Sequence, residues 1–199
     1  TNPFYHAWKA GAIESDSKIL WLNAKESNNY NPNIDDLSVE TLKSISIMYL
    51  CFPTNPHGAL TNIDYFIKVI NLAREYDFIL AIDECYIDIY RTSYSKPIGC
   101  LDAIVKMNVN LDNIVIFNSL SKRSNVPGLR AGFIVGDEGI ISLFKRLRSY
   151  CAPAIPIPAS VSIIMPAAPV IPVPLIVIIC ALISALSRFK ANGCASRTF

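Results

Sequence analysis

Apolar residues along this chain fall into short runs that alternate with amphipathic segments. Four runs combine β-branched and aromatic residues and are apolar almost throughout, which predicts buried strands; they lie at residues 45–52, 78–83, 113–119 and 131–137. A further short strand is expected in the sequence KILWL, at residues 18–22.

Helices are predicted between these strands, at residues 4–13, 36–43, 61–75, 99–107 and 138–148. Either Asp36 or Ser38 can cap the second helix. Either Thr61 or Asn62 can cap the third. Because apolar strands alternate with helices, the sequence predicts an α/β fold, with a mostly parallel sheet that is flanked by helices.

Three polar segments lie at the ends of predicted strands: PTNPHG follows one strand, DECY ends the next, and SLSK follows a third. Ligands of open α/β sheets bind beyond the carboxyl ends of the strands, so we expect Asn55, Asp83 and Lys122 to converge on one rim. Lys122 alone has two other interpretations. It can be a solvated loop charge, or it can be the lysine of a Ser119-x-x-Lys122 acyl-transfer motif, although the partner sequences S-D-N and K-T-G are absent.

Composition excludes several classes of protein. The 199 residues are 52% hydrophobic and 17% charged with a net charge of +2, which argues against a nucleic-acid partner and against a disordered chain. All sixteen acidic residues lie in residues 1–138, whereas residues 139–199 hold six Lys and Arg and no acid. Six cysteines without CxxC spacing and two histidines predict no metal site, and they favour a reducing, cytoplasmic compartment.

The rim residues meet several needs of pyridoxal phosphate. Lys122 can hold the aldehyde as an imine, and Asp83, where an apolar strand emerges, can pair with the pyridine nitrogen. Tyr86 and Asn55 can meet the phenolic oxygen, and the Arg130 guanidinium can bind the phosphate together with a serine. A buried carboxylate is costly without a cation, so Asp83 is expected to require a cationic partner.

Three motifs resemble those of the fold-type I aminotransferases of classes I and II. PTNPHGAL resembles their N-P-T-G loop, AIDECYIDIY their D-E-x-Y strand end, and NSLSKRSNVPGLRAGFIVGD their S-x-S-K…R-x-G cofactor-lysine segment. With NPFYHAW and GDE, the last segment is most similar to succinyldiaminopimelate aminotransferases of bacterial lysine biosynthesis. The resemblance covers residues 1 to about 160.

This resemblance implies a Schiff-base role for Lys122 as the catalytic residue. The residues it implies at the cofactor are Asn55, Asp83, Tyr86, Ser119, Ser121, Lys122 and Arg130. It further implies pyridoxal 5'-phosphate as the cofactor, an amino acid and a 2-oxo acid as substrates, a homodimer, and a cis bond before Pro56. Relatives usually have an aromatic residue at the position of Asn2, where Phe4 or Tyr5 is expected to compensate.

Whole relatives are roughly twice as long as this chain, as expected of two-domain enzymes. We therefore expect residues 1–160 to form part of the cofactor-binding large domain and residues 161–199 to be an aberrant or divergent apolar tail. The proline-free run from Leu175 to Ser187 is shorter than the ~20 residues that span a bilayer. Out-of-frame translation is the preferred explanation of the tail; a divergent in-frame tail and a membrane segment are the others.

The leading hypothesis is a pyridoxal-phosphate-dependent transaminase, with no nucleic-acid or membrane partner. The alternatives are a different aminotransferase of the same classes and a non-catalytic fragment of such an enzyme. Since segments that complete the site in relatives are not recognisable, we expect the isolated chain to bind the cofactor weakly, if at all, and not to turn over amino acids.

Overall fold

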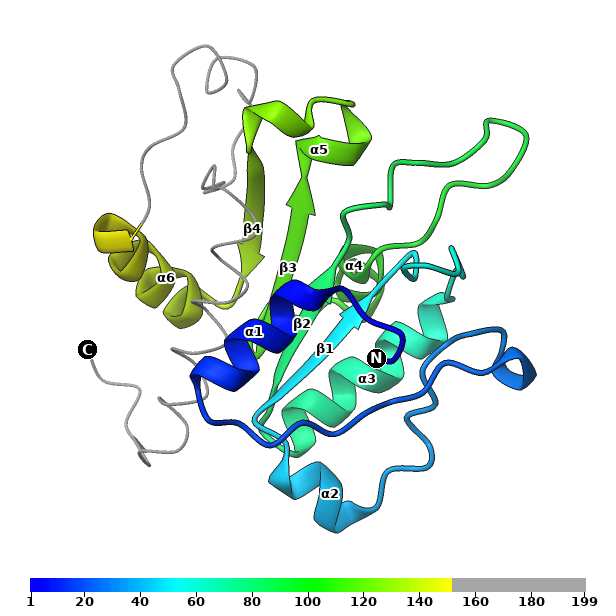
Figure 1. Cartoon of the computed structure of the whole chain (residues 1–199). Coiled ribbons are helices and arrows are strands. Elements are labelled where there is room, and N and C mark those ends of the chain that lie inside the picture. The colour runs from blue at the N-terminus through cyan, green and yellow to red at the C-terminus, as the bar shows by residue number, and fades with distance from the viewer. Residues whose placement is uncertain (152–199) are drawn as a thin grey trace.

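The computed structural model describes residues 1–151 (Figure 1). The expected apolar tail, at residues 161–199, lies outside the described residues. Within the described part of the chain, no helix is both long and apolar enough to cross a membrane.

Within residues 1–151, four strands form a single sheet in the order β1-β2-β3-β4. They are β1 (Ile47–Cys51), β2 (Ile79–Asp83), β3 (Ile114–Ser119) and β4 (Gly132–Gly136). The first three are parallel, and β4 runs antiparallel to β3, which confirms the predicted mostly parallel sheet.

The prediction of a strand at residues 18–22 is wrong. This segment pairs at one point only, where the backbone N–H of Asn2 donates to Leu22 and the N–H of Ala24 donates to Asn2. The result is an isolated bridge between Asn2 and Asn23. An apolar run therefore does not become a strand here, because no neighbouring strand continues the ladder.

The predicted helices are present, with bounds that differ by a few residues: α1 (His6–Glu14), α2 (Val39–Ser44), α3 (Ile63–Glu75), α4 (Cys100–Met107) and α6 (Glu138–Cys151). Short helical turns were not predicted: η1 (Glu26–Asn28), α5 (Leu120–Arg123) and η2 (Pro127–Leu129). Ser38 caps α2 and Asn62 caps α3, each by accepting a hydrogen bond from a backbone N–H of the first turn.

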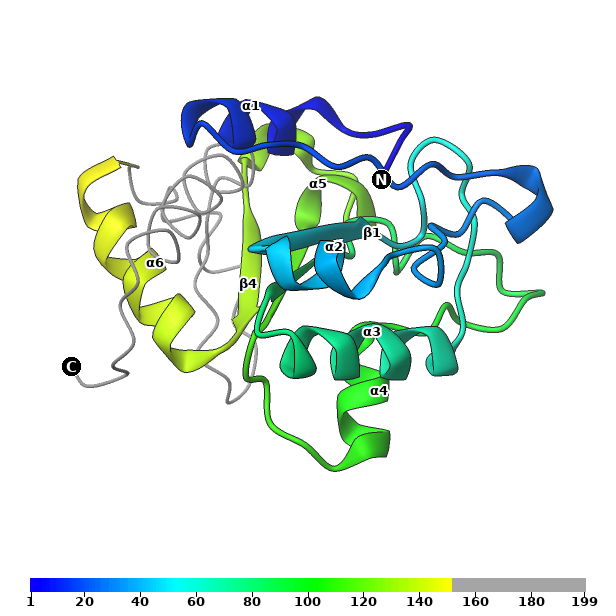
Figure 2. The same ribbon diagram turned by 90° about the horizontal axis from the view of Figure 1, so that it is seen from below.

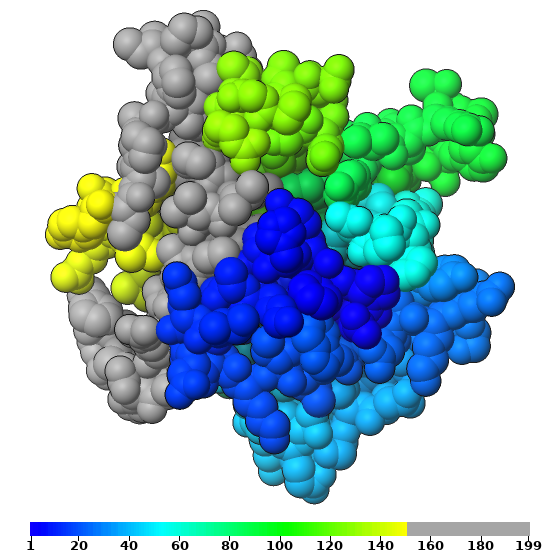
Figure 3. Space-filling model, in the orientation of Figure 1, coloured from blue at the N-terminus to red at the C-terminus, as the bar shows by residue number. Residues whose placement is uncertain are grey.

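Helices cover both faces of the sheet. Figure 2 shows α1 on one side and α3 and α4 on the other. Side chains alternate between the faces along each strand. The first core, under α1 and α6, contains Trp8, Tyr49, Ala81, Phe117 and Phe144; the second, under α3 and α4, contains Leu50, Phe66, Leu80, Ile82 and Ile116. In the space-filling view the N-terminal segment, in dark blue, lies over the middle of the first face (Figure 3).

Candidate functional site

The carboxyl ends of β1, β2 and β3 lie at one edge of the sheet, because these strands are parallel. Asp83 is the last residue of β2 and pairs in register with Cys51 of β1 and Phe117 of β3. Asn55 follows β1, and Ser119 ends β3. The sheet therefore carries the three predicted loops at the same edge, as expected for a ligand-binding rim.

Asp83 is a buried carboxylate, with 5% of its surface exposed. Its Oδ1 accepts a hydrogen bond from the backbone N–H of Cys85 at 3.0 Å, and its Oδ2 accepts one from the Tyr49 hydroxyl at 2.5 Å. Within residues 1–151, no lysine or arginine forms an ion pair with it. The cationic partner that the sequence predicts is therefore not a side chain of the described residues.

Burial and the charge of Asp83 raise the pKa of Tyr49 well above its ordinary value. Tyr49 consequently keeps its proton at neutral pH and remains a donor to the carboxylate. Burial, followed by the neighbouring charge of Asp83, also raises the pKa of the Cys51 and Cys85 thiols, so they stay neutral beside the site.

Lys122 lies on α5, directly beyond the end of β3, and its side chain is exposed. Its Nζ is 5.8 Å from the centre of the Tyr86 ring, which belongs to the loop after β2. The next residue, Arg123, forms an ion pair with Asp88 at 3.3 Å between Nε and Oδ2. These two contacts join the lysine segment to the loop that follows β2, and they bring Lys122 and Tyr86 together.

Ser119 is 1% exposed and caps α5: its Oγ accepts a hydrogen bond from the Ser121 N–H at 3.1 Å. The same hydroxyl lies 3.5 Å from the carbonyl of Ala131, so it is engaged by the backbone on both sides of the turn. The backbone N–H of Leu120 donates to Ala131 at 3.0 Å, which holds the start of β4 beside α5.

Arg130 ends η2 in a left-handed conformation, with φ at 50°, and is exposed. Its Nη1 donates to the carbonyl of Pro127 at 2.7 Å. The backbone of Arg130 therefore directly precedes Ala131 at the rim. Its guanidinium, in contrast, points back to the η2 turn, where it contacts Pro127. The structure places the arginine beside the lysine segment and does not bring its side chain into contact with the other predicted site residues.

Of two smaller expectations, one has a clear outcome and the other, that Phe4 or Tyr5 compensates for Asn2, stays a prediction. The bond between Asn55 and Pro56 is cis, which confirms that prediction. Phe4 packs in an aromatic cluster with Trp8 and Trp21, at ring distances of 5.8 and 4.7 Å. Tyr5 lies near Tyr86, whose pKa is raised chiefly by burial and, to a lesser degree, by groups that include Tyr5.

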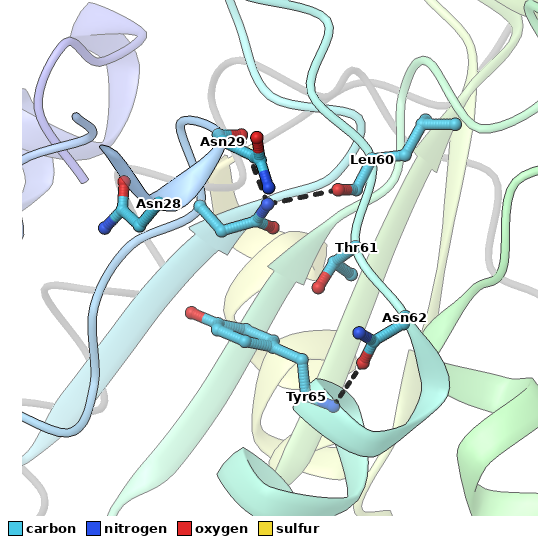
Figure 4. Close-up of a pocket in the computed structure, with 7 residues that line it drawn as sticks. Asn28, Asn29, Leu60, Thr61, Asn62 and Tyr65 are labelled. Atoms are coloured by element: carbon cyan, nitrogen blue, oxygen red, sulfur yellow. Dashed lines mark hydrogen bonds between the residues drawn. The ribbon is translucent and has the colours of Figure 1, made fainter. Parts of the chain in front are cut away.

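A separate pocket of about 400 Å³ lies between residues 28–31 and the start of α3 (Figure 4). It is lined by Asn28, Asn29, Asn31, Leu60, Thr61, Asn62 and Tyr65, and it contains none of the predicted site residues. Asn31 donates to the carbonyl groups of Asn29 and Leu60, so its amide joins this loop to the chain before α3. These amides connect two loops, and the pocket contributes no residue to the rim where the predicted site residues lie.

Sequence reasoning missed three residues at the rim: Tyr49, Glu84 and Asp88. The signal for Tyr49 was a phenolic hydroxyl near the middle of the apolar run ISIMYLCF. Glu84 and Asp88 are acids next to predicted site residues, which sequence spacing alone does not distinguish from solvated charges.

The arrangement therefore offers an accessible amine, a buried carboxylate without a cation among the described residues, a phenol close to the amine, and a serine-capped turn.

Residues 1–170 match the family model described as aminotransferase class I and II. An LL-diaminopimelate aminotransferase of Aquifex aeolicus is 30% identical over 148 residues, covering 74% of this chain and 37% of that protein. The glutamate-pyruvate aminotransferase of Escherichia coli is 29% identical, covering 75% of this chain and 35% of its own length.

Solved structures agree. An aminotransferase from Neisseria meningitidis is 33% identical with a TM-score of 0.74, covering 93% of this chain and 42% of that one. The matched part of the chain thus covers only 35–42% of the length of these relatives.

Proposed function

The chain belongs to the class I and II aminotransferase family, whose members depend on pyridoxal phosphate, and we propose that it forms the cofactor-binding part of a transaminase. The observation that carries this proposal is Asp83. A carboxylate that is 5% exposed and pairs with no described cation fits the protonated ring nitrogen of the cofactor. When bound, pyridoxal phosphate supplies an electron sink for the substrate.

Each rim residue has a proposed task that follows from its position. Lys122 holds the cofactor through its amine and moves a proton at Nζ, which lies 5.8 Å from the centre of the Tyr86 ring. Tyr86 and Asn55 meet the phenolic oxygen of the cofactor. Burial raises the pKa of Tyr86, so its hydroxyl stays protonated and can donate.

The phosphate is assigned to the turn that follows β3. Ser119, Ser121 and Arg130 lie at this turn or beside it, and all three carry donors. The guanidinium of Arg130 now donates to the carbonyl of Pro127, so binding a phosphate requires this exposed side chain to exchange one acceptor for another.

For substrates, we propose an amino acid and a 2-oxo acid, with succinyldiaminopimelate of lysine biosynthesis as the preferred amino donor. The form of the SLSKRSNVPGLR segment supports this choice, as do relatives that are named for diaminopimelate. A different class I or II transaminase is the alternative, favoured by the similarity to a glutamate-pyruvate enzyme. We propose that the intact protein is a homodimer. Three buried free thiols, Cys51, Cys85 and Cys100, support a cytoplasmic location.

The test of cofactor binding is absorbance near the visible edge after pyridoxal phosphate is added to the chain. Because the isolated chain is expected to bind weakly, the cofactor is added to saturation. We then expect a band that disappears in Lys122→Ala and persists in Lys106→Ala, which removes an exposed lysine of α4, on the face of the sheet that α3 and α4 cover. A band that is equal in both variants would mean that surface amines bind the cofactor, and the proposal would be wrong.

A further inference from the structure

The Tyr49 hydroxyl is the one described side-chain donor to Asp83, and the cofactor roles assigned above do not include it. We propose that Tyr49 is a positioning residue, which fixes the Asp83 carboxylate in the orientation that receives a ring nitrogen. This inference rests on the proposed function, since it names a residue that acts on the cofactor through Asp83.

The sheet register brings the two side chains together. Tyr49 lies opposite Ala81, and Cys51 lies opposite Asp83, so Tyr49 and Asp83 form a diagonal pair on the same face of adjacent strands. Diagonal neighbours are within reach of an aromatic side chain. Ala81, which carries only a methyl group, leaves the ring of Tyr49 room to extend along the sheet toward the rim.

Helix α1 holds the ring from the other side. Trp8 is stacked on Tyr49, with the ring centres 6.0 Å apart and the planes 22° apart. Tyr49 itself is 8% exposed, and Trp8 packs in turn against Phe4 and Trp21. The hydroxyl is therefore presented by a packed aromatic cluster, which allows its ring little freedom.

Two donors on different oxygens determine the plane of the carboxylate. The Cys85 N–H meets Oδ1 and the Tyr49 hydroxyl meets Oδ2, and each oxygen retains further acceptor capacity for a cation. Without the hydroxyl, only one oxygen is held and the carboxylate can rotate away from the nitrogen. Burial raises the pKa of Tyr49 well above its ordinary value, so the residue donates rather than competes as an anion.

Tyr49→Phe removes only the hydroxyl, and Tyr65→Phe is a matched control. Tyr65 also carries a largely buried hydroxyl, which donates to the carbonyl of Pro32 at 2.8 Å, away from the rim. Each variant is titrated with pyridoxal phosphate and with the analogue in which a C–H group replaces the ring nitrogen. Binding is measured by equilibrium dialysis and is counted only where it is lost in Lys122→Ala.

We expect Tyr49→Phe to weaken binding of pyridoxal phosphate about tenfold, in line with the loss of one hydrogen bond to a charged group. Binding of the analogue should change less than twofold, because it offers Asp83 no nitrogen. Tyr65→Phe should leave both ligands unchanged. In an Asp83→Asn background, Tyr49→Phe should have no further effect on binding.

Three results would overturn the inference: unchanged binding of pyridoxal phosphate by Tyr49→Phe, an equal loss for both ligands, or an additive loss in the Asp83→Asn background. If the unmodified chain shows no Lys122-dependent binding of pyridoxal phosphate, the proposed function is contradicted, and the positioning role of Tyr49 is contradicted as well. If Tyr49→Phe does not fold, the ¹³Cζ resonance of Tyr49 in the unmodified chain decides. It should move when pyridoxal phosphate binds and stay in place with the analogue; equal movement with both contradicts the inference.

Discussion

Glu84 should make the folded chain lose stability as the pH rises. Its carboxylate is 5% exposed, and its Oε1 accepts a hydrogen bond from the Cys100 N–H at 2.6 Å, at the start of α4. Burial raises the pKa of Glu84 from 4.5 to about 7, and the hydrogen bond from Cys100 offsets this only in part. Neighbouring carboxylates raise the pKa further; they belong to Asp102, Asp83 and Asp88.

The sign follows from linkage between protonation and folding. Because the pKa of Glu84 is higher in the folded chain, the folded state binds this proton more tightly than the unfolded state does. The resulting stability is fully present below pH 4.5 and is lost as the pH rises through about 7. One pKa unit corresponds to about 1.4 kcal/mol, so the loss is ~3 kcal/mol. This is a large share of the ~5–15 kcal/mol that usually stabilises a domain.

Urea unfolding of the unmodified chain and of Glu84→Gln, from about pH 4 to about pH 8, measures this loss. Glutamine keeps an oxygen for the Cys100 N–H and has no charge to desolvate. The variant should therefore gain ~3 kcal/mol over the unmodified chain between the two ends of the range. Glu75→Gln, at an exposed position of α3, controls for the removal of one negative charge. A difference between Glu84→Gln and the unmodified chain that does not change with pH would refute the reasoning.

Three further substitutions test the site and the core. Arg130→Lys keeps the charge and loses the two-pronged guanidinium, so pyridoxal phosphate should bind ~1.5–3 kcal/mol more weakly in equilibrium dialysis; unchanged affinity would place the phosphate elsewhere. Phe66→Ala removes a ring that is 0% exposed in the second core, and urea unfolding should show a loss of ~3–5 kcal/mol, whereas a loss below ~1 kcal/mol would contradict that packing. Asn62→Ala deletes the cap of α3 and should cost ~1 kcal/mol in the same measurement, with Asn62→Ser restoring most of it; no recovery in the serine variant would show that the cap is not responsible.

The strands could be predicted because each is a nearly continuous apolar run. Such a run is typical of a strand that is buried on both faces, as in a sheet covered by helices. The choice between neighbouring caps could not be made, because Asp36 and Ser38 have side chains of similar capping ability, and Thr61 ranks only somewhat below Asn62. The prediction of a strand at KILWL was wrong, because a hydrophobic pattern does not indicate whether a neighbouring strand is available for pairing.

The rim was predictable in outline, since parallel strands align their carboxyl ends whatever the length of the connections. The contact between Tyr49 and Asp83 was not predictable, because it depends on the register of β1 against β2, which pairs Cys51 with Asp83. The direction of the Arg130 side chain depends on a left-handed turn that the sequence NVPGLR does not specify by itself.

The central claim is that Lys122 is the amine that holds the cofactor, and the most direct test is to find which lysine takes up pyridoxal phosphate. Borohydride reduction fixes the cofactor on its amine, and peptide mass mapping then identifies the residue. At limiting pyridoxal phosphate, we expect label on Lys122 ahead of the exposed Lys68 and Lys106, with this preference reduced in Asp83→Asn. Equal labelling of the three lysines, unaffected by Asp83→Asn, would contradict the account.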